Sequence, residues 1–198
     1  WSEAELKKMF PYFCTLHSLA YKRLRLETHE IMDELDYMEL SDMTGRKFVN
    51  KMKKGNGIDI SMPTAQSQYQ DTINLAYAKY PHDKDRLQKI FREVKLPDYG
   101  ARSTIMQMDK DLTNFKRDRH KLEYVDYFNS FLEMKNPPPL KYLFIDEAQD
   151  LSAHQWMVVD MIQQISKPIE TYVAGDDDQA IFRWAGADIE HFIAMAKN

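Results

Sequence analysis

Hydrophobic positions between residues 28 and 135 recur at intervals of three and four, with polar residues between them. In the stretch 29–38, for example, Ile31, Met32, Leu35 and Met38 fall on one face of a helix. The residues between these positions are mostly polar, and alternating strand patterns are nearly absent. The spacing predicts helices over 29–38, 42–57, 63–80, 83–96, 103–119 and 121–135.

The pattern changes after the rigid connector NPPPL at 136–140. A strand over 141–146, a helix over 152–165, a strand over 171–175 and a helix over 187–196 are predicted next. This alternation is typical of a parallel sheet covered by helices. The aromatic stretch PYFCTL at 11–16 predicts a further strand of the same sheet, followed by a helix with a basic face.

These patterns predict an α/β domain made of residues 1–27 and 136–198, interrupted by a helical insertion over 28–135. The 198 residues are enough for one or two domains with a real core. With 43% hydrophobic and 29% charged residues, a soluble globular protein is expected. The single cysteine excludes an internal disulfide and a cysteine metal cluster, which fits a reducing compartment.

No apolar run approaches the roughly 18 residues that a membrane-spanning helix needs. No signal peptide is recognisable either, so a cytoplasmic location without a membrane partner is expected. The net charge of −4 means that any contact with nucleic acid must come from a local patch.

The two strands predicted after the connector both lead into acidic residues. The first ends in Asp146 and Glu147, and the second ends in Gly175 followed by three aspartates. Ligands of open α/β sheets bind at the carboxyl ends of the strands. One carboxylate can hold Mg²⁺, and a second can orient or deprotonate an attacking water. In the alternative interpretation, Asp146 or Asp150 only caps the helix that follows.

The second strand end continues as AGDDDQAIFRWAGAD over 174–188. Gln179 can both donate and accept a hydrogen bond, so it could sense a phosphate. Phe182 and Trp184 could stack on bases, with Arg183 adding positive charge. The alternative interpretation is an acidic surface turn followed by aromatic residues of the core.

The segments FIDEAQDLS and VAGDDDQAIFRWAGAD, in this order, resemble motifs II and III of the UvrD/Rep group of superfamily 1 DNA helicases. FCTLHSLAYKRL at 13–24 is similar to motif Ib of that group, and EYVDYFNSFLEM at 123–134 is similar to the acidic-aromatic helix that often precedes motif II. The resemblance implies part of a RecA-like motor domain with a helical inserted subdomain. It also implies ATP and Mg²⁺ as cofactors, and single-stranded and duplex DNA as partners.

The resemblance implies a role for each matching residue of the ATP site. Asp146 would bind Mg²⁺, and Glu147 would be the catalytic base for attack of water on ATP. Gln149 and Asp150 would support the site, and Gln179 would contact the γ-phosphate and couple it to DNA. We therefore expect Asp146, Glu147, Gln149 and Gln179 to bind the nucleotide.

The resemblance also implies residues that face DNA. Trp184 would stack on a base with Phe182 beside it, and Thr15 and His17 would lie on the DNA-facing side of the motor domain. For His17, a local hydrogen bond at a helix N-terminus is an equally weighted alternative. The family often has W-R-G-A where this chain has Trp184-Ala185-Gly186-Ala187, so Arg183, two places before the family's arginine, is not a simple replacement for it.

Three basic stretches are candidates for phosphate contacts, with solvated helix faces as the alternative. They are 22–25, 46–47 with 51–54, and 116–119.

The sequence contains no G-x-x-x-x-G-K-[ST] phosphate loop, and its first residue is Trp1. In the resembling family that loop lies upstream of motif Ib, and a second motor domain follows. The expectation is therefore an internal segment of a helicase that depends on the remaining helicase domains and is inactive alone. Two alternatives are a non-catalytic DNA- or protein-binding module and part of a helicase-nuclease.

Overall fold

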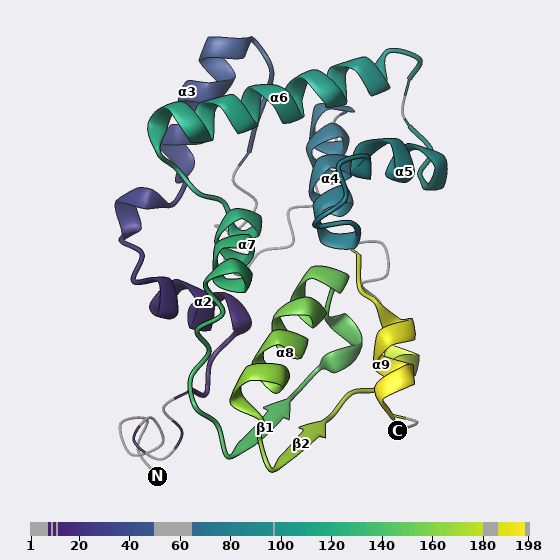
Figure 1. Ribbon diagram of the computed structural model, residues 1–198. Coiled ribbons are helices and arrows are strands. Elements are labelled where there is room, and N and C mark those ends of the chain that lie inside the picture. Colours follow the sequence, from purple (N-terminus) through teal and green to yellow (C-terminus); the bar gives the residue numbers. More distant parts are fainter. Residues whose placement is uncertain are drawn as a thin grey trace.

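The computed structural model describes residues 8, 10, 12–49, 65–96, 98–179 and 186–196. Strand β1 (Tyr142–Ile145) and strand β2 (Glu170–Val173) form a parallel pair, in register from Tyr142 opposite Glu170 to Ile145 opposite Val173. Helix α8 (Ala153–Ser166) connects them and helix α9 (Ile189–Ala196) follows (Figure 1). The predicted strand–helix–strand–helix order over 141–196 is confirmed.

The two faces of this small sheet differ. Ile145 is buried and Leu143 packs against the core that contains α8. Phe144 and Tyr172, which are directly paired across the strands, stack with their ring centroids 4.8 Å apart and remain largely exposed. Side chains alternate between the faces because the strand period is two. One face of the sheet therefore carries the core of this region, and the other is open in the described residues.

The strand predicted over 11–16 is wrong for the residues that the structure describes. Residues 12–15 form no strand, and helix α2 (Leu16–Leu24) starts immediately after them. The Thr15 side chain accepts a hydrogen bond from the Ser18 N–H at 3.2 Å. A hydroxyl that satisfies a free N–H of the first turn favours helix initiation at that residue, so the chain enters α2 where the predicted strand would end.

The middle of the chain is helical. It contains the 3₁₀ turn η1 (Thr28–Glu30), α3 (Glu34–Thr44), α4 (Ala65–Lys79), α5 (Arg86–Glu93), α6 (Ala101–Arg119) and α7 (Tyr124–Met134). Figure 1 shows α6 lying across α3 and α4. The helix predicted over 42–57 is wrong over residues 45–49, because α3 ends at Thr44. Gly45 caps it, with a φ of 65° in the left-handed region that glycine adopts readily.

Separate cores hold the two regions. The core of the helical region comes from α3 to α6 and consists of Met32, Tyr37, Leu40, Phe48, Tyr69, Ile73, Ala76, Ile90, Phe91, Ala101, Ile105, Met108, Leu112 and Phe115. Helix α7 belongs instead to a second core, because Tyr127, Phe128 and Phe131 pack with Leu19 of α2 and Val158 of α8.

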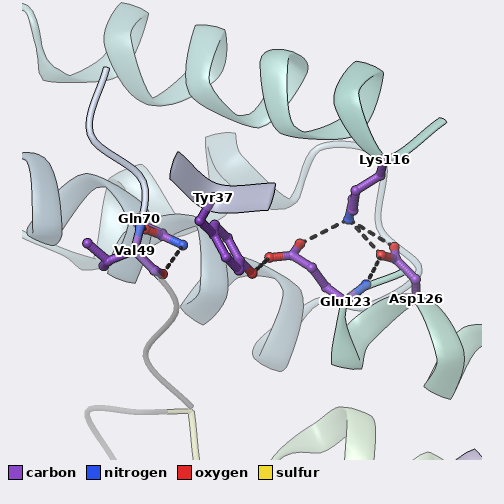
Figure 2. Close-up of polar contacts among 6 residues, drawn as sticks. All are labelled: Tyr37, Val49, Gln70, Lys116, Glu123 and Asp126. Carbon is purple, nitrogen blue, oxygen red and sulfur yellow. Dashed lines mark hydrogen bonds and ion pairs between the residues drawn. The ribbon is translucent and has the colours of Figure 1, made fainter. Parts of the chain in front are cut away.

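A polar network holds α7 to the helices above it (Figure 2). Lys116 of α6 forms ion pairs with Glu123 at 3.0 Å and Asp126 at 2.8 Å, and the Tyr37 hydroxyl donates to Glu123 at 2.5 Å. Close by, the Met32 N–H donates to the Leu122 carbonyl at 3.0 Å. The two chain crossings between the regions, near 31 and near 122, are therefore tied to each other.

Within the described residues, no helix combines the length and apolar character needed to cross a bilayer.

Candidate functional site at the strand ends

The β1 end turns sharply into solvent. Ile145 is buried, whereas Asp146 and Glu147 directly after it are exposed. Glu147 has a φ of 52°, in the left-handed region that costs a residue with a side chain on the order of 1–2 kcal/mol. The Ala174 N–H donates to the Ile145 carbonyl at 2.8 Å, and the Ala148 N–H donates to the Ala174 carbonyl at 3.0 Å. The backbone therefore ties the two strand ends together around this turn.

Gln149 connects the two strand ends through its side chain. It is only 2% exposed. Its Nε2 donates to Glu147 Oε2 at 2.7 Å, and its Oε1 accepts the Asp176 N–H at 3.1 Å. The β1 carboxylate and the first residue of the acidic loop after β2 are thus joined by one buried amide.

The loop after β2 is organised around Asp176. One carboxylate oxygen accepts the Asp178 N–H at 3.0 Å, and the other accepts the Gln179 Nε2 at 2.6 Å. Asp178 and Gln179 are exposed, and the 3₁₀ turn η4 (Asp177–Gln179) carries them. Adjacent carboxylates repel one another, so a cation or hydrogen-bond donors are needed near them. For Asp176, a backbone N–H and an amide side chain fill that need.

The described residues contain no cluster of three or more His, Cys, Asp or Glu side chains that could hold a metal ion alone. Mg²⁺ does not require such a cluster, since it keeps several waters and takes one or two carboxylates beside substrate phosphates. The exposed Asp146 and Glu147 carboxylates supply hard oxygen atoms at the strand end. The donor set present therefore fits Mg²⁺ bound together with a phosphate compound.

Two buried polar atoms lie behind this turn. Asp150 Oδ1 and His154 Nε2 have no hydrogen-bond partner among the described residues. Burial, and then the charge of Glu147, raise the pKa of Asp150. Both residues line a cavity of about 1020 Å³ between the helical region and the α/β region, and this cavity does not reach Asp146 or Gln179. The strand-end carboxylates open onto the surface instead.

Thr15 immediately precedes α2, and His17 lies in the first turn of that helix, where it lines the same cavity as Asp150 and His154. The Thr15 hydroxyl caps the helix, as described above. The His17 ring stacks on Phe128 with centroids 4.3 Å apart and meets Tyr124 edge-on at 4.8 Å. Burial lowers the pKa of His17 to about 4, so its ring is neutral at pH 7. The same is true of His154, whose pKa is also about 4.

Phe182, Arg183 and Trp184 lie outside the described residues. The chain is described again from Gly186, which has a φ of 99°. A Cβ at this position would lie 3.0 Å from Ala78 Cβ and 3.3 Å from Leu75 Cδ1, both on α4. The segment that follows the aromatic motif therefore packs its backbone directly on the helical region.

Several residues of the basic stretches bind other residues of the same chain. Arg23 donates to the Asn136 carbonyl at 2.7 Å, and Arg46 pairs with Asp111 at 2.9 Å. Lys116 is buried in the network of Figure 2, so neither a phosphate contact nor a solvated helix face describes it. Arg117 and Arg119 are exposed at the surface, although each has an acidic partner. Residues 51–54 lie outside the described residues.

The sequence interpretation missed two glycines of this site. Gly175 leaves the space that Gln149 occupies, since a Cβ there would lie 2.4 Å from Gln149 Oε1. Gly186 makes the close contact with α4. The available signal was positional, because an isolated glycine at a strand end or after an aromatic motif often marks a close approach of the backbone.

The strand-end geometry is that of an α/β protein with a ligand site. Carboxylates and amides gather where two parallel strands end, which is where α/β proteins bind their ligands. The family model of the UvrD/REP helicase N-terminal domain matches residues 5–198. The chain belongs to this family of helicases.

Curated relatives agree with the family match. A probable DNA helicase II homolog of Rickettsia felis is 33% identical over 78 residues, which is 36% of this chain and 12% of that protein. The ATP-dependent DNA helicase PcrA of Bacillus subtilis is 37% identical over 59 residues, which is 29% of this chain and 8% of that protein. The ATP-dependent DNA helicase Rep of Buchnera aphidicola subsp. Baizongia pistaciae is 40% identical over 56 residues, with shares of 28% and 8%. Each match thus spans a small part of the relative.

Proposed function

We propose that this chain is a segment of an ATP-dependent DNA helicase and carries half of its ATP site. The observation that supports this most strongly is the hydrogen-bonded connection from Glu147 through Gln149 to Asp176 and Gln179. It brings together the two motifs that ATP hydrolysis by such a helicase would use. The family match and the names of the relatives agree with it.

In the proposed reaction, Asp146 holds Mg²⁺ and Glu147 takes the proton of the attacking water. The metal, when bound, neutralises charge that develops on the phosphates. Glu147 is suited to its role because its carboxylate is exposed and one of its oxygens is held by Gln149. Gln179 contacts the γ-phosphate. To do so, its amide would give up its hydrogen bond to the Asp176 carboxylate and donate to a phosphate oxygen instead.

DNA binding would use a different set of residues. Trp184 stacks on a base of single-stranded DNA, with Phe182 beside it and Arg183 adding positive charge. Thr15 and His17 lie on the DNA-facing side of the motor domain. His17 would act as a neutral aromatic ring there, since burial keeps it uncharged at pH 7.

The domain organisation and the role of further helicase domains are also proposed. Residues 1–27 and 136–198 would belong to a RecA-like motor domain, and 28–135 to its inserted helical subdomain, whose last helix, α7, packs on the motor domain. The 198 residues contain no phosphate loop of the G-x-x-x-x-G-K-[ST] form. We therefore propose that the remaining helicase domains act with this segment and that the segment alone turns over little ATP. We also propose a cytoplasmic location and a role in DNA repair.

The test is an ATPase assay, with and without single-stranded DNA, on the complete gene product and on these 198 residues. The expected result is DNA-stimulated turnover by the complete product and none by the segment. Robust turnover by the segment alone would contradict the proposed division of the site. DNA binding without any turnover by the complete product would instead favour a non-catalytic binding module.

A further inference from the structure

We infer that Gln149 is a positioning residue that couples the two strand ends, rather than a residue that touches the nucleotide. The inference deepens the proposed function and rests on it for its meaning in catalysis. Its structural content rests on the side chains of Glu147 and Gln149, the backbone N–H of Asp176 and the glycine at position 175.

The amide of Gln149 is committed inside the protein. The residue is 2% exposed, its Nε2 donates to Glu147 Oε2 at 2.7 Å, and its Oε1 accepts the Asp176 N–H at 3.1 Å. A buried amide that loses a partner carries the cost of an unsatisfied polar group. Turning Gln149 towards a ligand would break both bonds, so the side chain is held in place from both sides.

Gly175 is shaped to leave room for this amide. A Cβ at position 175 would lie 2.4 Å from Gln149 Oε1, well below any normal contact, and 3.0 Å from Phe192 Cζ. The β2 end therefore has a glycine where the Gln149 oxygen passes. An amide that only filled space would not need to lie against the backbone of the neighbouring strand.

The hydrogen bonds continue from Asp176 to Gln179, the residue proposed to contact the γ-phosphate. Asp176, whose N–H is held by Gln149, accepts the Gln179 side chain at 2.6 Å. A movement or loss of charge at Glu147 would change the donor position of Gln149, and this would shift Asp176 and then Gln179. The alternative path is the direct backbone bond from Ala148 to Ala174 at 3.0 Å, which bypasses the side chain.

The experiment separates these two paths by NMR on the 198-residue chain, without nucleotide or DNA. Glu147→Ala removes the acceptor of the Gln149 amide. In the parent chain, we expect this change to shift the backbone amide resonance of Asp176 and the side-chain amide resonance of Gln179. In a Gln149→Met background, both shifts should be lost.

Gln163→Met is the matched control. Gln163 donates to the Thr171 hydroxyl of β2 at 3.2 Å, from α8 and away from the turn. Its replacement also removes a glutamine that bonds to β2, yet the response to Glu147→Ala should stay intact. If Asp176 responds to Glu147→Ala equally with and without Gln149, the backbone path carries the coupling and the inference is wrong.

Exchanging the residue types at positions 147 and 149 tests the hydrogen bond between them without relying on Gln149→Met. Gln149→Glu places two carboxylates against each other and should lower the midpoint of thermal unfolding by roughly 5 °C. Adding Glu147→Gln restores a donor and an acceptor in reversed order, so most of that loss should be recovered. No recovery in the double variant would overturn the inference. Because neither readout uses ATP or DNA, failure of the helicase proposal would be seen separately, in the ATPase assay.

Discussion

The helical region and the strand-end site treat their polar groups in opposite ways. Where α7 meets the helical region, Lys116, Glu123, Asp126 and Tyr37 satisfy one another in a mostly buried network. At the strand ends, Asp146 and Glu147 are exposed, and buried atoms behind them lack partners among the described residues. Paired buried groups fix a structure, whereas open carboxylates and unpaired atoms are common where a protein does chemistry. The difference separates the scaffold of this chain from its site.

The largest expected effect comes from breaking the network of the helical region. Lys116→Met leaves the Glu123 and Asp126 carboxylates half-buried without their cation, so it should lower the free energy of unfolding by about 3–5 kcal/mol. Arg117→Met on the next residue is the control. Arg117 is exposed and pairs with exposed Asp118, so its loss should cost less than about 1 kcal/mol.

Urea denaturation of both variants measures this difference. Equal losses for Lys116→Met and Arg117→Met would mean that the network does not hold the scaffold. Burial alone would lower the pKa of Lys116, but its two carboxylate partners outweigh burial and raise it. The contribution of Lys116 is therefore full below its ordinary pKa and is lost only at strongly alkaline pH.

The next effect lies at the contact between the two regions. Gly186→Ala forces a side chain into a left-handed backbone and against Ala78, so it should cost roughly 3 kcal/mol. Gly45→Ala is the matched control, because Gly45 has a φ of 65° but nothing within 4 Å of its added Cβ. A similar loss for both variants would show that only the backbone angle matters and that the packing on α4 does not.

The third effect depends on pH. The pKa of His17 is about 4 in the folded chain, below its ordinary value of 6.5. Its stabilising contribution is therefore present above pH 6.5 and is lost as the pH falls towards 4. His17→Phe keeps a ring against Phe128 without a titrating group, so between pH 7 and pH 4 it should lose roughly 2 kcal/mol less than the parent.

Denaturation series at pH 7 and pH 4 measure this change. An unchanged pH dependence in His17→Phe would contradict the assignment of the buried neutral ring.

The same variant tests the role of His17 in DNA binding. A folded His17→Phe chain that binds single-stranded DNA with reduced affinity would indicate a polar contact by His17, in addition to its packing.

The smallest effect is expected on the open face of the sheet. Phe144 and Tyr172 stack across the strands but are largely exposed. Phe144→Ser should therefore lower the free energy of unfolding by only about 0.5–1 kcal/mol. A loss as large as that of Lys116→Met, measured in the same denaturation series, would mean that this face belongs to the core.

The sequence predicted the parts of the fold that depend on long local patterns. The parallel pair, α8 and α9 follow from alternation of apolar runs and turns, and the structure contains them. The strand predicted over 11–16 was wrong for its described residues because Thr15 caps a helix, a local hydrogen bond that outweighs aromatic strand preference. The helix predicted over 42–57 was wrong over residues 45–49, because α3 ends at Thr44 with Gly45 as its cap.

The candidate site was predicted as residues but not as a geometry. Two acidic strand ends pointed to Asp146, Glu147 and Gln179, yet no local pattern shows that Gln149 lies between them. That contact joins residues 27 positions apart and depends on the register of β1 with β2. The burial of Lys116 was missed for a similar reason, since its partners come from a different helix.

The central claim is that the strand-end carboxylates form the hydrolytic half of an ATP site. The most direct test is single-stranded-DNA-stimulated ATP hydrolysis by the complete gene product with Glu147→Gln, compared with the parent. The account predicts a loss of turnover of about 10²–10⁴-fold, with the affinity for Mg-ATP retained, because only the proton acceptor is removed. Turnover within a few-fold of the parent would contradict it.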